Sequence, residues 1–216
     1  MIRNYTFPGL ATRVLCGSGT LAQTGEEIAR LGHSRVLMLS TAHQRSKADA
    51  RAARLGGPAI GVFSGTAMHT PTNVTEAALV VFATTGTTAV VARVGGSTAG
   101  MEKLSRCEVV VTTTCAGSEI TNILGETAGG TKTTRRDLAI RPEALIYDVD
   151  LKLTLLIAMK MASGLNAMSH AMEAFYAADR NPIIELMCRD ALRAFKSGLP
   201  ILAQDPQNRP ARTEAQ

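Results

Sequence analysis

Residues 36–41 read Val-Leu-Met-Leu-Ser-Thr, an apolar run that ends in two hydroxyl side chains. A run without polar alternation is typical of a strand buried on both faces of a parallel sheet. Similar short runs recur along the first half of the chain and beyond, at residues 13–16, 59–63, 88–92, 109–111 and 144–147. Helical segments separate them. This alternation predicts an α/β fold with a mostly parallel sheet covered on both faces.

The segments between these strands predict helices over residues 20–31, up to about residue 55, and about 73–83. Thr20 is a candidate N-cap of the first helix, and Gly32 is well placed to end it. Residues 120–140 change in character, since they are rich in glycine and threonine. They predict a hairpin or a loop excursion.

After about residue 150 the sequence predicts only helices, over residues 163–178 and 183–199, with Asn181-Pro182 between them. Ser163 is a candidate N-cap of the first of these helices. The composition shift at 150–162 divides the chain into an α/β domain, 1–155, and a helical domain, 156–216. The polar tail from residue 204 is expected to fray.

Composition excludes several classes of protein. The 216 residues are 45% hydrophobic and 19% charged, which excludes a disordered chain. The absence of an apolar signal segment or long apolar run argues against secretion and a membrane partner, so a cytoplasmic protein is expected. The net charge of +5 comes with 4% aromatic residues and no Trp, which argues against nucleic acid. Four widely spaced cysteines predict reduced thiols.

Three predicted strands end in small polar residues. The segments are Ser40-Thr41, Gly95-Gly96-Ser97-Thr98, and Thr113-Thr114 followed by Gly117-Ser118. In an open parallel sheet, ligands bind beyond the carboxyl ends of the strands. A Gly-Gly turn that leads into a helix lets backbone amides approach a phosphate. A phosphate site and an ordinary structural loop are both compatible with this pattern.

The first helix after the boundary carries a second candidate site. Asn166, His170 and Glu173 follow one another at i, i+4 and i+7, so they share a face apart from the apolar stripe. That stripe comprises Leu165, Met168, Met172, Phe175 and Tyr176. Asn166 and His170 are candidates to line a cleft between the domains. The alternative is a partly buried, structurally satisfied histidine. Zinc or iron would require more ligands than this helix supplies.

Two further basic positions lie in connecting segments. His69 follows a predicted strand and is interpreted as an exposed loop residue. Lys132, near Arg135-Arg136, belongs either to a solvated hairpin face or to a cleft that binds a dianion.

Four stretches in combination resemble the maleylacetate reductases, a branch of the iron-containing alcohol dehydrogenase superfamily. They are TTTCAGSEITNILGETAGGTKTTRRD (112–137), PEALIYDVDL (142–151), SGLNAMSHAMEAFYA (163–177) and NPIIELM (181–187). The resemblance implies a dinucleotide-binding α/β domain followed by the start of an all-helical domain, with the active site between them. It also implies NADH- or NADPH-dependent reduction of maleylacetate, a small dianion, to 3-oxoadipate during the degradation of aromatic compounds.

The resemblance also implies residue roles. Gly95, Gly96, Ser97 and Thr98 would hold the cofactor pyrophosphate, and Thr113, Thr114 and Ser118 would line the nicotinamide and its ribose. Ser40 and Thr41 would lie near the adenosine ribose. Lys132 would reach the cofactor or substrate, while Asn166 and His170 would bind the substrate and His170 would polarise it.

Metal-dependent members of the superfamily have an Asp where this chain has Asn166, so no metal is expected to be required. Family members also continue beyond the second helix, so an incomplete helical domain of low stability is expected. A metal-dependent alcohol or glycerol dehydrogenase and a non-catalytic remnant that binds only nucleotide are the alternatives. The choice between NADH and NADPH stays open, and a homodimer is compatible with this prediction.

Overall fold

The computed structural model describes residues 4–7, 9, 12–67, 69–93, 108–113, 120–138 and 141–215. The chain divides into two compact units. One is Ala11–Asp148, and the other is Val149–Gln216 together with Met1–Leu10. The two units therefore separate after residue 148. The boundary after residue 155 between an α/β domain and a helical domain stays a prediction.

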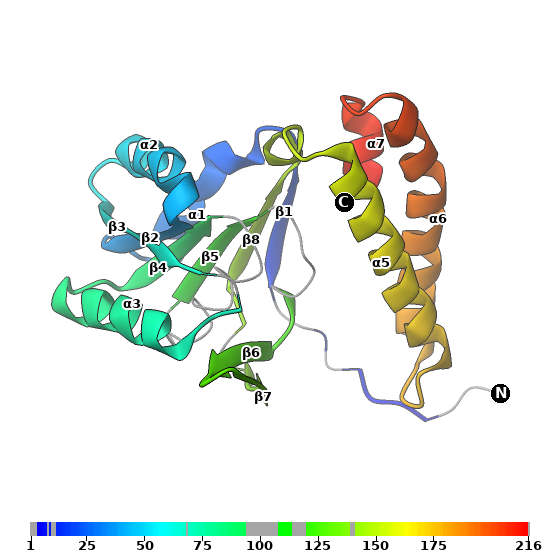
Figure 1. Cartoon of the computed structure of the whole chain (residues 1–216), viewed down its shortest axis with the longest axis horizontal. Helices are drawn as coiled ribbons and strands as arrows, with labels where there is room; N and C mark the ends of the chain where they lie inside the picture. The colour runs from blue at the N-terminus through cyan, green and yellow to red at the C-terminus, as the bar shows by residue number, and fades with distance from the viewer. Residues whose placement is uncertain are drawn as a thin grey trace. The chain divides into compact units, whose positions relative to one another are not determined.

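The first unit contains a six-stranded sheet in the order β1-β8-β5-β4-β2-β3 (Figure 1). All of its neighbouring strands are parallel. The strands are β1 Arg13–Gly17, β2 Val36–Thr41, β3 Ala59–Thr66, β4 Ala89–Arg93, β5 Glu108–Thr113 and β8 Ala144–Asp148. The α/β fold with a mostly parallel sheet is thus confirmed.

Helices cover both faces of this sheet. Leu37 and Leu39 of β2 face α3 (Thr72–Thr84), whereas Val36 and Met38 face α1 (Thr24–Arg30) and α2 (Arg45–Leu55). These four side chains are at most 2% exposed. Each contributes about 1.5–3 kcal/mol through burial, which explains why the run carries no polar residue.

The helix expected over residues 20–31 is split into a 3-10 turn η1 (Thr20–Gln23) and α1. Thr20 does not cap it, so that prediction is wrong. Its hydroxyl instead donates to the carbonyl of Gly17 at 3.1 Å. Gly32 does end the segment, with φ 80° and its amide bonded to the carbonyl of Ala29 at 2.9 Å.

The glycine-rich segment forms an antiparallel hairpin of β6 (Ile123–Ala128) and β7 (Thr131–Arg136). Gly129 and Gly130 have φ 55° and 78° and make the two-residue turn. A type I′ turn needs positive φ at both positions, which glycine adopts without strain. The amide of Thr127 donates to the carbonyl of Thr70 at 3.1 Å, which ties the hairpin to the segment before α3.

The second unit consists of η5 (Val149–Lys152), α5 (Ile157–Tyr176), α6 (Pro182–Gln204) and α7 (Arg209–Glu214). Helix α5 begins six residues before Ser163, so the predicted N-cap is wrong. Lys160 is buried in the added stretch, and Gly164 is buried just after it. Lys160 Nζ donates to the carbonyl of Ala215, and Gly164 packs against Leu199. The Lys160 contact helps to explain why the helix extends towards its N-terminus.

Helix α6 begins at Pro182, one residue before the predicted start, and the Asn181 side chain caps it by accepting hydrogen bonds from the amides of Ile183 and Ile184 at 3.1 and 3.2 Å. It ends at Gln204, five residues beyond the predicted end. The expected frayed tail is wrong. It forms α7, in which Ala211 and Arg212 are buried. Among the described residues, no helix combines the length and apolar character that a membrane span requires.

Candidate functional site

The carboxyl ends of the six parallel strands lie at one edge of the sheet. Ser40 and Thr41 end β2, and Thr113 ends β5. Only β4 lies between those two strands, so the structure brings these strand ends together as expected. Six of the other candidates fall outside the described residues, and their roles stay predictions: Gly95, Gly96, Ser97, Thr98, Thr114 and Ser118.

Ser40 is fully buried, and its Oγ has no hydrogen-bond partner in the described part of the chain. Gln44, in the 3-10 turn η2 (Ala42–Gln44) that follows β2, has a buried Oε1 without a partner there. An unsatisfied buried polar atom costs about 1–3 kcal/mol, and a polar ligand removes that cost. Ser40 therefore fits a cofactor hydroxyl. Sequence reasoning missed Gln44. The one sequence feature that could have indicated it as a ligand-binding residue is its position just after the end of a predicted strand.

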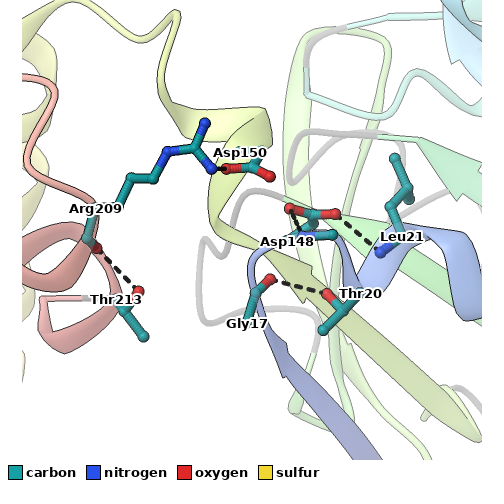
Figure 2. A network of polar contacts seen from close by, with 8 residues as sticks. Gly17, Thr20, Leu21, Asp148, Asp150, Arg209 and Thr213 are labelled. Carbon is teal, nitrogen blue, oxygen red and sulfur yellow. Dashed lines mark hydrogen bonds and ion pairs between the residues drawn. The ribbon is translucent and has the colours of Figure 1, made fainter.

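Asp148 is another residue that sequence reasoning missed at this edge. It ends β8 and is 3% exposed (Figure 2). Its Oδ1 accepts from the amide of Gly19 at 3.2 Å, and its Oδ2 accepts from the amide of Leu21 at 2.9 Å. Asp148 thereby does the capping that was expected of Thr20. An acidic residue directly after a buried strand was the available signal.

Lys132 is exposed on β7, directly opposite Thr127 of β6. Thr127 in turn is bonded to Thr70, just beyond the carboxyl end of β3. The hairpin that carries Lys132 is thus anchored on the side of the sheet where the strands end. His69 is exposed, as expected, and both it and Thr70 have positive φ, 65° and 49°.

The polar face predicted on α5 is present. Asn166, His170 and Glu173 are all exposed, and His170 Nδ1 lies 3.3 Å from Glu173 Oε2. The expectation of a partly buried histidine is wrong, because the His170 side chain is 68% exposed. The apolar stripe is divided: Met168 and Phe175 are half-buried, whereas Leu165, Met172 and Tyr176 are exposed. The catalytic and substrate-binding roles of Asn166, His170 and Lys132 stay predictions.

A divalent metal needs several ligating side chains, such as His, Cys, Asp or Glu, close together. Within the described ranges, no group of three or more His, Cys, Asp or Glu side chains is placed to hold one. Asn166 adds only a neutral amide beside His170. These residues by themselves do not fit an iron site.

Comparison with known protein families matches residues 11–149 to the iron-containing alcohol dehydrogenase model. Residues 160–216 match the C-terminal model of the same family. The chain belongs to the iron-containing alcohol dehydrogenase family. The first match covers the unit that contains the parallel sheet, and the second covers most of the helical unit.

Within this family, the chain resembles maleylacetate reductases. It is 47% identical to that of Rhizobium sp. (strain MTP-10005) and 42% identical to that of Sphingobium indicum, over 98% of this chain in each case. It spans 62% and 61% of the length of these curated relatives. The crystal structure of the Rhizobium enzyme matches with a TM-score of 0.96 at 46% identity, and covers 99% of this chain and 63% of that one.

A more distant neighbour is the sulfoacetaldehyde reductase from Bifidobacterium kashiwanohense, whose structure was solved in complex with NAD⁺. It is 19% identical with a TM-score of 0.90, and the match covers 100% of this chain and 64% of that one. At this identity the likeness concerns the fold alone.

Proposed function

We propose that this chain acts in the NADH- or NADPH-dependent reduction of maleylacetate to 3-oxoadipate, as an oxidoreductase that acts on a carbon–carbon bond. The observation that carries the proposal is its 47% identity to a maleylacetate reductase over 98% of its own length. The anionic substrate, the use in aromatic-compound degradation and a cytoplasmic location belong to the same proposal.

The cofactor would lie along the carboxyl edge of the sheet. Ser40, Thr41 and Gln44 would hold the adenosine ribose, and the buried, unpartnered Oγ of Ser40 supports this placement. Residues 95–98 would hold the pyrophosphate, and Thr113, Thr114 and Ser118 the nicotinamide ribose. When bound, the reduced nicotinamide supplies a hydride to the double bond that is conjugated to the substrate ketone.

The chain's own side chains would bind and orient the dianion. Lys132 offers an ammonium group to one carboxylate, and the Asn166 amide can donate to another. His170 would donate a hydrogen bond to the ketone oxygen, where negative charge develops during the reduction. Holding the two reactants in a reactive geometry would supply much of the rate. The described residues contain no group of three or more His, Cys, Asp or Glu side chains placed to hold a metal, and none is assigned a role here.

The test is oxidation of NADH by the purified chain in the presence of maleylacetate. His170→Ala should lower kcat/KM by about 100-fold or more, since a positioned proton donor contributes about 10²–10⁴-fold. Ser169→Ala, at the adjacent exposed position on α5, is the matched control. A wild-type chain that is folded but does not oxidise NADH would overturn the proposal.

A second candidate is a chain that binds the nucleotide without turnover. The buried Ser40 Oγ, which has no hydrogen-bond partner in the described residues, bears on nucleotide binding and not on turnover. Calorimetric titration with NADH and with NADPH distinguishes the two functions, because this candidate predicts nucleotide binding together with no NADH oxidation. The same titration decides which cofactor is preferred.

A further inference from the structure

The β6–β7 hairpin presents two different faces. Leu124 of β6 is 2% exposed and marks one of them. The strand register pairs Gly125 with Thr134 and Thr127 with Lys132. Because side chains alternate along a strand, these four residues share the face opposite Leu124. Lys132 is thus one diagonal step from Gly125 on the same face.

The end of the Lys132 side chain lies directly over Gly125. A Cβ atom added at Gly125 would stand 3.0 Å from Lys132 Cε and 3.7 Å from Nζ. Contacts as short as 3.0 Å are strongly repulsive for two carbon atoms, since their optimal separation is about 3.5–4.0 Å. Any other residue at position 125 therefore requires the end of the lysine side chain to shift by at least a few tenths of an ångström.

The backbone gives no separate reason for a glycine here. Gly125 lies inside a regular strand, and its φ is not in the left-handed region, unlike the φ of the turn residues Gly129 and Gly130. Glycine weakens strands and often marks a place where another group approaches closely. At Gly125 that group is the Lys132 side chain.

We propose that Gly125 is a positioning residue for Lys132: its bare Cα provides the space that keeps the lysine ammonium against the hairpin face. The use of that ammonium for the cofactor or the dianion rests on the proposed function. A larger side chain at position 125 would turn the lysine away from this face. The lysine ammonium would then spend less time against the hairpin face, where the proposed function has it bind the cofactor or the dianion.

The decisive variant is Gly125→Val, because a β-branched residue favours a strand while it fills the space under the lysine. Thr133→Val is the matched control. Thr133 is exposed and lies on the face of the hairpin opposite Lys132 and Gly125. Both variants should unfold in urea at the wild-type midpoint or above it. Lost function in Gly125→Val would then not be attributable to lost folding.

The first measurement is the rate at which an amine-reactive reagent, trinitrobenzenesulfonate, modifies Lys132, followed by peptide mass mapping. We expect that Gly125→Val changes this rate several-fold and leaves the rate of exposed Lys47 unchanged. Thr133→Val should change neither rate. Equal Lys132 rates in wild type and Gly125→Val would overturn the positioning role, whether or not the chain reduces maleylacetate.

The second measurement is a double-mutant cycle on kcat/KM for NADH oxidation with maleylacetate. Gly125→Val should lower kcat/KM by about ten- to a hundredfold, as expected for a misplaced binding group. In the Lys132→Met background the same change should have no further effect, because coupled residues are not additive. Equal effects in both backgrounds would overturn the inference. Absence of turnover in the wild type would overturn the proposed function only, since the modification rates still decide the position of Lys132.

Discussion

The buried carboxylate of Asp148 stabilises the start of η1, which lies more than a hundred residues earlier in the chain. It accepts the amides of Gly19 and Leu21, 127 or more residues earlier in the chain. Asp148→Ala leaves both donors without this acceptor, and we expect a loss of about 1–3 kcal/mol in the free energy of unfolding, measured in urea. Asp148→Asn should cost less, because the amide retains one acceptor oxygen.

The matched control for this prediction is Asp150→Ala. Asp150 Oδ1 pairs with Arg209 Nη1 at 2.8 Å, but the two side chains are 35% and 56% exposed (Figure 2). Asp150 is half-buried, but the arginine is exposed and solvent screens the pair, so the pair is worth about 0–1 kcal/mol and this change should have the smaller effect. If Asp150→Ala destabilised the chain more than Asp148→Ala, the capping role of Asp148 would be wrong.

Arg212 is a cation in the interior of the helical unit. It is 1% exposed, its Nε donates to the carbonyl of Pro206 at 2.7 Å, and Nη1 donates to the carbonyl of Lys152. Burial lowers the pKa of its guanidinium, because desolvation disfavours the charged form. The buried charge is thus stabilised only in part by these carbonyls.

We therefore expect Arg212→Ala to destabilise the chain by about 2–4 kcal/mol, because it removes the hydrogen bonds and leaves a cavity. Arg212→Met should cost less, since it keeps much of the volume and removes the desolvation cost. Thermal and urea unfolding of the two variants measure the difference. Equal losses would mean that the hydrogen bonds, rather than packing and charge, determine the contribution of Arg212.

At the scale of elements, α5 and α6 approach each other closely at Gly164. A Cβ atom there would lie 2.7 Å from Leu199 Cδ2. Gly164→Ala gains about 1 kcal/mol of helix propensity, but overpacking costs about 1–3 kcal/mol, so we expect net destabilisation in urea unfolding. In a Leu199→Ala background the clash is absent, and Gly164→Ala should then stabilise the chain. Stabilisation in both backgrounds would contradict this account of the crossing.

At the scale of the whole molecule, the helical unit exposes many large apolar side chains. Five of them on α5 and α6 are 57–72% exposed: Leu165, Met172, Tyr176, Leu186 and Met187. Each forgoes a large part of the roughly 1.5–3 kcal/mol that full burial of such a side chain contributes. We expect the chain to be marginally stable and to associate as its concentration rises, which light scattering measures.

Met172→Glu should reduce that association, because it places a charge among the exposed apolar side chains of α5, next to Leu165 and Tyr176 in the helix. Ser163→Glu adds the same charge on another side of α5 and should have little effect. A wild-type chain that stays monomeric and melts cooperatively would contradict the expectation of marginal stability.

The features that the sequence predicted correctly are local in origin. The apolar run at 36–39, the pair Gly129-Gly130 and the Asn181-Pro182 boundary each indicate a strand, a turn or a cap through their own chemistry. Their outcomes did not depend on distant residues. The wrong predictions, at Thr20, Ser163 and the tail, concern positions where a partner far along the chain decides the structure. Lys160, for example, bonds to a residue 55 positions later.

The amino-acid order by itself determined that this chain would form a parallel α/β sheet followed by helices. The hydrophobic pattern and the backbone preferences that indicate these elements are properties of a few neighbouring residues. The tertiary structure decided which side chains meet. It gave Asp148 the capping role, left the Ser40 hydroxyl buried without a partner in the described ranges, and laid Lys132 over Gly125. Such contacts depend on strand order and register, which bring distant segments together and which no short stretch of sequence encodes.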